Sequence, residues 1–311
     1  MSNWFQKFFD QTFHTALSSI PVRMGNLRQY PPRPLRQEVI MPRDFAGRYP
    51  SIGIVTPTFK QAQFLERTVN SVVTQAYPSL RYAVVDGGSQ DGTPEILAKL
   101  AKDYPFKWVS EPDRGQSDAI NKGFGMVSGE IMAWLNSDDI LLPRALLFVG
   151  SYFDQHPDVD VIYGHRILIN EDDLEIGRWI TPPFEAEALK FFDFVPQETL
   201  FWRRRIWDKV GANLNVDFHF ALDWDLLQRF ADAGAVIRRL PVFLGCFRVH
   251  KDQKTSARMV DVGRKEMSWL RPDVNSDPAL KRHMTRLYHR EQVRSQLSSL
   301  LLHCGIRSTR L

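Results

Sequence analysis

Three segments carry acidic side chains at points where an apolar run ends or a helical pattern begins. Asp86 follows an apolar run in VVDGGSQDGT, and Asp91 comes five residues later. Asp138 and Asp139 close MAWLNSDD, and Asp223 opens ALDWDLLQRF. Carboxylates in such places can bind a divalent cation, accept hydrogen bonds from a ligand or act as a general base.

The first acidic segment combines a carboxylate with three turn-forming glycines. Gly87, Gly88 and Gly92 let the backbone turn sharply and approach a ligand closely. Asp86 at the strand end can accept hydrogen bonds from a nucleobase N–H group or from ribose hydroxyls. The alternative is a simple strand-ending turn, which Asp and Gly also favour.

The second acidic segment, Asn136-Ser137-Asp138-Asp139, places oxygen ligands on one short loop. Adjacent carboxylates are costly unless they are solvated or neutralised by a cation. Hard oxygen ligands suit Mg²⁺ or Mn²⁺, which take phosphate oxygens and waters at the remaining positions. The alternative is an N-cap for the helix predicted after Pro143, a role that suits Asp139 better than Asp138. Asp138 is therefore the candidate metal ligand.

In the third segment, Asp223 and Asp225 lie roughly 200° apart around the predicted helix, so they cannot both face one cleft. Asp223 shares the apolar face that must pack inward. Asp225 points toward Arg229 four residues later, which predicts an exposed ion pair. Asp223 is thus the candidate for the site, and a helix N-terminal carboxylate favoured by the dipole is the alternative.

Basic and imidazole groups follow an apolar run late in the chain, in CFRVHKDQKTS. We expect this segment to fold over a diphosphate, with Arg248 and Lys254 supplying positive charge. His250 would complete the shell of a metal ion. A purely structural histidine is the alternative.

The elements that must position these groups alternate between strand and helix from Ser51 onward. Apolar runs and helical periodicity predict strands at 52–56, 81–85, 107–110, 130–135 and 159–163, and helices at 64–74, 93–102, 117–127 and 143–155. This order is typical of an α/β fold with a mainly parallel sheet and helices on both faces. Ligands bind such sheets at the carboxyl ends of the strands, where the acidic segments fall.

The pattern loosens after residue 164. A hairpin is predicted from 167–170 and 177–181, a helix at 223–233 and a strand at 236–240. Residues 4–20 predict an amphipathic helix and 21–50 a Pro/Arg-rich linker, and the tail from Arg264 is predicted to be mostly helical. We divide the chain into 1–50, a catalytic domain at 51–256 and a basic helical extension at 257–311.

Composition excludes several classes of protein. A hydrophobic content of 43% and a charged content of 24% are ordinary for a soluble globular chain of 311 residues. No run reaches the ~18 apolar residues of a membrane span, and the start lacks the features of a secretory signal. Two cysteines without a Cys/His cluster fit a reducing, cytoplasmic location. The middle, 51–263, holds 29 acidic and 23 basic residues, which argues against a nucleic-acid groove.

Six segments of the chain together resemble glycosyltransferase family 2, whose members have the Rossmann-like GT-A fold. They occur in the order of the family and span roughly residues 51–256. The segments are TPTFKQAQFLERTVNSVVTQAYPSLRYAVVDGGSQDGT, EPDRGQSDAINKGF, SGEIMAWLNSDD, PQETLFWRRRIWDKVG, ALDWDLLQRF and FRVHKDQKT.

The resemblance implies a role for each matching position. It implies that Asp223 is the catalytic base, that Asp138 and His250 contact the metal ion or phosphate, and that Asn136 stands first in the family's Asp-any-Asp motif. An asparagine there loses a charge and leaves Asp138 as the main ligand. The donor contacts that the resemblance implies are Thr56, Pro57, Thr58, Asp86, Asp91, Gln116, Asp118, Asn121, Lys122, Asn136, Ser137, Arg248 and Lys254.

The activity implied is an inverting, Mg²⁺- or Mn²⁺-dependent sugar transfer from a nucleotide-diphosphate donor, with a UDP-sugar favoured. The acceptor would be a saccharide or a lipid-linked glycan. Rival readings are a nucleotidyltransferase, which would want a Gly-rich phosphate loop that TPTFKQ lacks, and a non-catalytic sugar-nucleotide-binding protein, which would need none of the acidic groups. The helix at 4–20 would lie on the inner membrane face or pack against protein, including a second copy of the chain.

Overall fold

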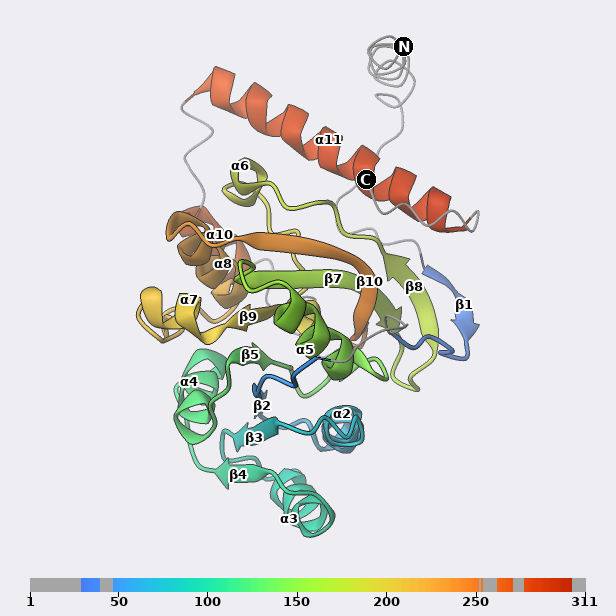
Figure 1. Ribbon diagram of the computed structural model, residues 1–311, viewed down its shortest axis with the longest axis vertical. Coiled ribbons are helices and arrows are strands. Elements are labelled where there is room, and N and C mark those ends of the chain that lie inside the picture. Colours follow the sequence, from blue (N-terminus) through green and yellow to red (C-terminus); the bar gives the residue numbers. More distant parts are fainter. Residues whose placement is uncertain (1–28, 40–46, 252, 254–261, 271–276, 304–311) are drawn as a thin grey trace.

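The computed structural model describes residues 29–39, 47–251, 253, 262–270 and 277–303. The predicted helix at 4–20, half of the Pro/Arg-rich linker and Lys254 lie outside these ranges. Within them the chain forms a ten-stranded mixed sheet with helices on both faces (Figure 1). No helix of the described residues is long and apolar enough to cross a membrane.

The first half of the fold is a parallel sheet with crossover helices, as the alternating pattern predicts. Its elements are β2 (Ile52–Thr58), α2 (Ala62–Val73), β3 (Leu80–Asp86), α3 (Thr93–Asp103), β4 (Lys107–Ser110), α4 (Gln116–Met126) and β5 (Ile131–Trp134). Strand β2 pairs in parallel with β3 and β5, and β3 pairs with β4. The register sets Thr58 opposite Asp86 and Asp86 opposite Ser110. The carboxyl ends of three strands therefore meet at one edge.

The second half extends this sheet with antiparallel and mixed pairs. Its elements are β6 (Ile140–Leu141), α5 (Ala145–Gln155), β7 (Val161–Ile169), β8 (Glu175–Trp179), α6 (Ala186–Leu189), the 3-10 helix η1 (Gln197–Thr199), β9 (Phe201–Arg203), α7 (Arg204–Lys209), α8 (Leu222–Asp232) and β10 (Ile237–Arg248). Strand β9 lies between β5 and β7, and β10 pairs in parallel with β7. The N-terminal strand β1 (Gln29–Arg33) adds to β8 at the edge. Helices α10 (Arg264–Leu270) and α11 (Pro278–His303) follow.

Three predicted elements differ from the observed ones. The predicted strand 159–163 and the first arm of the predicted hairpin form one strand, β7, because β10 and β8 pair along its length. Strand β10 runs through Pro241 to Arg248 instead of ending at Leu240, since β7 and β6 provide partners for its backbone. Helix α5 begins at Ala145 after Arg144 in a left-handed conformation, so Asp139 is not its N-cap.

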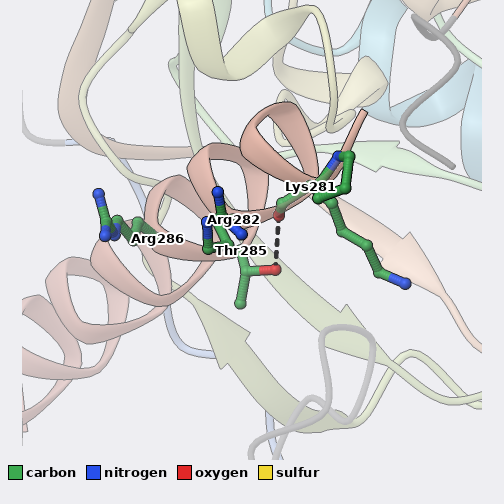
Figure 2. A pocket seen from close by; sticks show the side chains of 5 residues that line it. Lys281, Arg282, Thr285 and Arg286 are labelled. Carbon is green, nitrogen blue, oxygen red and sulfur yellow. Dashed lines mark hydrogen bonds between the residues drawn. The ribbon is translucent and has the colours of Figure 1, made fainter. Parts of the chain in front are cut away.

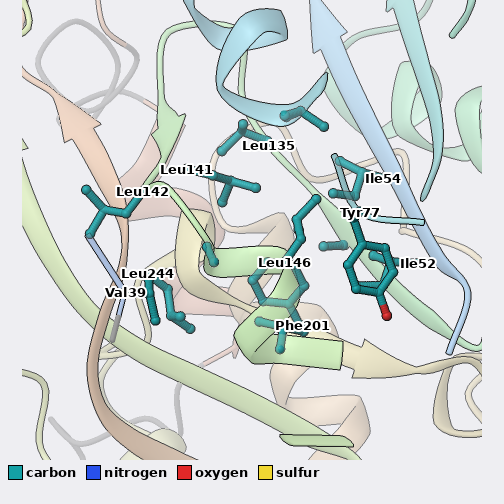
Figure 3. Close-up of a cluster of buried hydrophobic side chains, with 14 of the residues drawn as sticks. Val39, Ile52, Ile54, Tyr77, Leu135, Leu141, Leu142, Leu146, Phe201 and Leu244 are labelled. Carbon is teal, nitrogen blue, oxygen red and sulfur yellow. The ribbon is translucent and has the colours of Figure 1, made fainter. Parts of the chain in front are cut away.

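The alternation of side chains along β2 divides the core between the two faces of the sheet. Ile52 and Ile54 belong to a cluster with α2, α3 and α5, part of which Figure 3 shows. Val55 belongs to the cluster on the other face, together with α4, α7 and α8. The elements that lead into the acidic loops are therefore fixed by apolar packing on both sides.

Helix α4 lies so close to β2 that only glycine fits at position 123. A Cβ atom at Gly123 would come within 2.3 Å of Val55 Cγ1. We expect Gly123→Ala to lower the free energy of unfolding by about 1–3 kcal/mol, because the side chain overpacks the interface. Gly125 on the same helix has nothing within 4 Å of its Cβ position. Urea denaturation should show that Gly125→Ala keeps or slightly raises stability, and equal losses in both variants would contradict this account.

Candidate functional site

The loop after β3 is built around the buried carboxylate of Asp86. This residue is 0% exposed, and it accepts hydrogen bonds from Ser89 N–H at 3.0 Å, Ser89 Oγ at 2.5 Å and Ser110 Oγ at 2.6 Å. Ser89 Oγ in turn accepts the N–H of Lys60 at 2.7 Å. In this structure the Asp86 carboxylate holds the loop together, and its expected contact with a nucleotide stays a prediction.

Asp91 also braces this loop. Its carboxylate accepts hydrogen bonds from Thr93 Oγ1 at 2.7 Å and from the N–H of Ala62 at 3.1 Å, which joins the loop to the start of α2. Burial raises the pKa of Asp91, but these hydrogen bonds outweigh it and leave the pKa below its ordinary value. An ionised Asp91 therefore holds the loop against the helix.

Phe59 and Asp113, which the sequence did not single out, lie beside the loop after β3. Phe59 directly follows β2 and is 54% exposed, which is unusual for so large an apolar side chain. A Cβ atom at Gly87 would lie 3.2 Å from the Phe59 ring and 2.8 Å from Asp113 Oδ2. The backbone at Gly87 thus packs closely against the Phe59 ring and the Asp113 carboxylate, with no room for a larger side chain. The signals in the sequence were a phenylalanine at a strand end and the aspartate of EPDRGQ.

The three expected contacts on β2 are buried at the strand end. Thr56 is 0% exposed and accepts a hydrogen bond from Tyr82 Oη at 2.8 Å, and Pro57 is buried beside it. The hydroxyl of Thr58, which is 4% exposed, has no hydrogen-bond partner within the described part of the chain. Of these residues Thr58 keeps a polar atom available at the carboxyl end of the sheet.

The segment that opens α4 divides into a surface part and a part that reaches the second acidic loop. Asp118 pairs with Arg114 at 2.9 Å, and Lys122 pairs with Glu111 at 3.0 Å. Gln116 instead donates from Nε2 to Asn136 Oδ1 at 2.6 Å. The structure therefore brings Gln116 and Asn136 together, and it places Asp118 and Lys122 in ion pairs at the protein surface.

Asn121, also on α4, serves the scaffold rather than the donor pocket. Its side chain exchanges hydrogen bonds with both the N–H and the carbonyl of Leu214, at 2.8 and 2.9 Å. This pair of bonds fixes the segment that leads toward α8.

The loop after β5 is hydrogen-bonded to Thr68 on α2, and its Asp138 carboxylate lies next to the imidazole of His250. Thr68 Oγ1 donates to the carbonyls of Ser137 and Asp139, both at 2.8 Å. His250 Nε2 lies 3.1 Å from Asp138 Oδ2, although 112 residues separate them in sequence. The side chain of Asp138 is 22% exposed and that of His250 is 2% exposed. Asp138 and His250, both expected from the sequence to contact a metal ion or phosphate, therefore lie side by side.

These two groups fit a divalent cation as part of its shell. One carboxylate and one imidazole suit Mn²⁺ or Mg²⁺ when diphosphate oxygens and waters supply the other positions. The residues that the structure describes contain no group of three or more His, Cys, Asp or Glu side chains arranged around one metal position. If a cation binds here, Asp138 and His250 would supply two ligands and a nucleotide would have to supply others.

Arg248 is buried and bonded to the protein in this structure, and its expected contact with a diphosphate stays a prediction. Its side chain is 0% exposed and lies 4.9 Å from the ring of Phe64. It donates to the carbonyl of Asp138 at 2.7 Å and pairs with Asp173 at 2.5 Å. Strand β10 ends at Arg248, so the guanidinium lies at the edge of the sheet. Its hydrogen bond to the carbonyl of Asp138 holds that loop in place.

Asp223 lies in the first turn of α8, as predicted. Its Oδ1 accepts the N–H of Trp224 at 3.0 Å. Burial raises the pKa of Asp223 to about 6, while the nearby Arg166 opposes this rise and Glu198 adds to it. The predicted pair of Asp225 with Arg229 is confirmed at 2.8 Å, although both side chains are partly buried.

Arg166 and Glu198 form a buried ion pair that the sequence did not reveal. Arg166 on β7 donates from Nε and Nη2 to the two oxygens of Glu198 on η1, at 2.7 and 2.6 Å. The guanidinium lies 4.4 Å from the ring of Phe247. The only signal for Glu198 was its place in PQETLFW, and Arg166 gave none, because their contact joins residues on separate elements.

The same pair connects the second and third acidic segments. The pKa of Asp139 is raised well above its ordinary value by burial, by Asp138 and by Glu198, and Arg166 opposes the rise. Asp223 responds to the same two charges. Gln116 on α4 reaches the second segment through Asn136. The loop of Asp86 and Asp91 is instead tied to Ser110 and to the start of α2, so the contacts described join only the second and third acidic segments.

A depression elsewhere in the fold has different chemistry. It lies on α11 and is lined by Pro278, Lys281, Arg282, Thr285 and Arg286 (Figure 2). Thr285 Oγ1 donates to the carbonyl of Lys281 at 2.9 Å, which is a contact within the helix. None of the acidic residues described above lines it.

Known structures share this architecture. S. aureus TarS 1–349 in complex with UDP-GlcNAc superposes with a TM-score of 0.54 at 18% identity, over 67% of this chain and 61% of the TarS 1–349 chain. The mannosyltransferase PcManGT from Pyrobaculum calidifontis, in complex with GDP-Man and Mn²⁺, gives 0.56 at 18% identity, over 89% of this chain and 81% of PcManGT. These similarities, together with the sheet and its flanking helices, define the fold as GT-A.

Sequence comparisons give the family. The family model described as glycosyl transferase family 2 matches residues 53–213. A PGL/p-HBAD biosynthesis glycosyltransferase of Mycobacterium tuberculosis is 26% identical over 202 residues, which cover 64% of this chain and 77% of that protein. An uncharacterized glycosyltransferase of Nostoc sp. is 28% identical over 210 residues, which cover 64% of this chain and 65% of that relative. The chain belongs to glycosyl transferase family 2.

The raised pKa of Asp223 predicts a pH-dependent effect on stability. The folded protein binds the proton of Asp223 more tightly than the unfolded chain, whose carboxyl has the ordinary pKa of 3.8. The stability present below that value is therefore lost as the pH rises through about 6. We expect Asp223→Asn to raise the free energy of unfolding by about 1–3 kcal/mol near pH 7 and by much less near pH 4. Urea denaturation at both pH values measures this, and an equal gain at both would contradict it.

Proposed function

We propose that this protein transfers a sugar from a nucleotide-diphosphate donor to a hydroxyl of a saccharide or lipid-linked glycan, with inversion of the anomeric carbon. The observation that carries the proposal is the position of Asp223. Its carboxylate sits at a helix start beside the Arg166–Glu198 pair and has a pKa of about 6. A carboxylate with this pKa is ionised near neutral pH and is a stronger base than an ordinary aspartate.

The exposed ring of Phe59 supports a place for the nucleobase at the surface beside Phe59 and Asp113. The exposed ring of Phe59 offers a stacking face, and Asp113 offers an acceptor for a base N–H group. A UDP-sugar is favoured as donor, because TarS is similar in fold and its structure contains UDP-GlcNAc. PcManGT contains GDP-Man. The choice between uracil and guanine would therefore depend on the side chains around Phe59 and Asp113.

Asp138 and His250 would hold a divalent cation against the diphosphate, as their separation of 3.1 Å allows. A bound Mg²⁺ or Mn²⁺ would neutralise the charge that develops on the leaving group. The Mn²⁺ in PcManGT supports this cofactor class. Thr68 and Arg248 hold the loop of Asp138 in place for that contact.

The chemical step is a single displacement. The oxygen of the acceptor hydroxyl attacks the anomeric carbon on the face opposite the diphosphate, and Asp223 accepts the hydroxyl proton. The bond between the anomeric carbon and the phosphate oxygen breaks, and its electron pair leaves with the nucleoside diphosphate. The configuration inverts, and Asp223 later releases its proton to solvent.

A donor screen tests this function. Purified protein with Mg²⁺ or Mn²⁺ is incubated with a panel of nucleotide sugars and acceptor hydroxyls, and released nucleoside diphosphate is measured. Release of pyrophosphate from a nucleoside triphosphate would instead indicate a nucleotidyltransferase. Tight binding of a nucleotide sugar without turnover would indicate a binding protein.

Replacement of the proposed base should separate chemistry from binding. We expect Asp223→Asn to fold and to bind the donor as the wild type does, but to transfer sugar at least ~10²-fold more slowly, because an amide cannot accept the proton. Steady-state turnover and donor titration measure the two properties. Turnover close to that of the wild type would place the base elsewhere.

Replacement of the proposed metal ligand should affect binding instead. We expect Asp138→Ala to weaken metal-dependent binding of the nucleoside diphosphate by about 10-fold or more, because one carboxylate ligand is lost. Calorimetric titration with and without Mn²⁺ measures this. Asp158→Ala removes an exposed carboxylate after α5 and serves as the control. Equal metal-dependent affinity in Asp138→Ala and the control would contradict the assignment.

A further inference from the structure

A carboxylate from the C-terminal part of the chain reaches the loop in front of Asp223. Glu266 on α10 is 2% exposed. Its Oε1 accepts the N–H of His219 at 2.9 Å, and its Oε2 accepts the N–H groups of Phe220 at 2.8 Å and Ala221 at 3.0 Å. One buried side chain thus binds three successive backbone donors that end two residues before Asp223.

Helix α10 is packed tightly onto this loop. A Cβ atom at Gly263 would lie 3.0 Å from the ring of Phe220, so the chain comes as close as a glycine permits. The rings of Phe218 and Trp269 meet edge to face with centroids 5.8 Å apart. These contacts fix the position of Glu266 relative to the start of α8.

The backbone donors at the start of a helix attract carboxylates, because they lack partners within the helix and carry the positive end of its dipole. Asp223 follows the last of these donors by two residues, and Asp217 precedes the first by two. Without Glu266, the carboxylate of Asp223 would compete for the N–H groups of the loop and turn toward them. With Glu266 present, those groups already have an acceptor.

We propose that Glu266 is a positioning residue that occupies the backbone donors before α8 and so leaves the carboxylate of Asp223 directed at the acceptor hydroxyl. The proposal rests on the function proposed above, in which Asp223 is the base. It extends the catalytic unit beyond the matched family segment, which ends at residue 213, and into a helix that lies outside the predicted domain 51–256.

The charged groups around Asp223 come from several elements. Arg166 on β7 and Glu198 on η1 act on the charge of Asp223. His219 lies in the preceding loop, and Glu266 on α10 is hydrogen-bonded to the backbone of that loop. Of these, Glu266 is the acceptor for the backbone donors before α8. Its removal frees those donors for Asp223 and also removes a negative charge, and both changes favour the ionised form of Asp223.

The test compares Glu266→Ala with Glu266→Gln. We expect Glu266→Ala to lower kcat by about 10–100-fold with donor KM within about 2-fold, and to move the acid limb of the pH profile to lower pH. Glu266→Gln keeps an oxygen acceptor and should lie between wild type and alanine. Unchanged kcat and an unchanged acid limb in Glu266→Ala would overturn the proposal.

A matched control separates positioning from general loss of stability. Glu175 on β8 is also a 2% exposed carboxylate with three partners, Tyr30, Arg33 and Arg178, and it lies in the pairing of β1 with β8. Glu175→Gln should lose stability without moving the acid limb. If it lowers kcat and shifts the limb as Glu266→Ala does, the effect of Glu266 is only structural.

A double variant tells a failure of this inference from a failure of the proposed function. If Glu266 acts through Asp223, adding Glu266→Ala to Asp223→Asn should cause little further loss of kcat. Independent, multiplicative losses would overturn the positioning role while keeping Asp223 as base. Wild-type turnover in Asp223→Asn alone would overturn the proposed function itself. The change in stability that Asp223→Asn causes across pH, measured with and without Glu266→Ala, gives the same comparison without a substrate.

Discussion

The salt bridge between Arg166 and Glu198 is the interaction that allows several carboxylates to share one region of this fold. Burying a carboxylate costs several kcal/mol unless it is paired and hydrogen-bonded. Glu198 is completely buried, and Asp139 and Asp223 lie within its electrostatic reach. A two-point contact with one guanidinium fixes the direction of the charge as well as its sign. The pair thus stabilises Glu198 and moderates the repulsion that Asp223 would otherwise experience.

Around this pair, other charged residues act as braces for loops. Asp86 holds the turn after β3, Asp91 joins that turn to α2, and Arg248 supports the loop of Asp138. All three were expected to contact a donor. Their hydrogen bonds with the protein instead fix the backbone from which Phe59 and Asp138 project. A charged residue in a motif therefore contributes to a site either by touching the ligand or by shaping the loop that does.

The sequence predicted the parts of this protein that depend on local patterns. Apolar runs and helical periodicity were enough for the parallel half of the sheet, and helix geometry was enough to predict the ion pair of Asp225 with Arg229. The extension of β10 was missed because Pro241 breaks the local strand pattern, while pairing with β7 and β6 supports the backbone. The contacts of Arg166 with Glu198 and of Glu266 with the loop before α8 join distant residues, so no spacing along the chain reveals them.

The hydrogen-bond relay beneath Phe59 has a consequence for how a ligand would be received. Asp86 accepts the hydroxyl of Ser89, and that hydroxyl accepts the N–H of Lys60, whose backbone is held at a φ of 56°. This left-handed conformation is costly for lysine, so the surrounding bonds must maintain it. The backbone next to Phe59 is therefore set in place when the chain folds. A planar group that stacks on Phe59 would lose its own conformational entropy but would not have to order the loop. The binding free energy would therefore be reduced less by the cost of ordering.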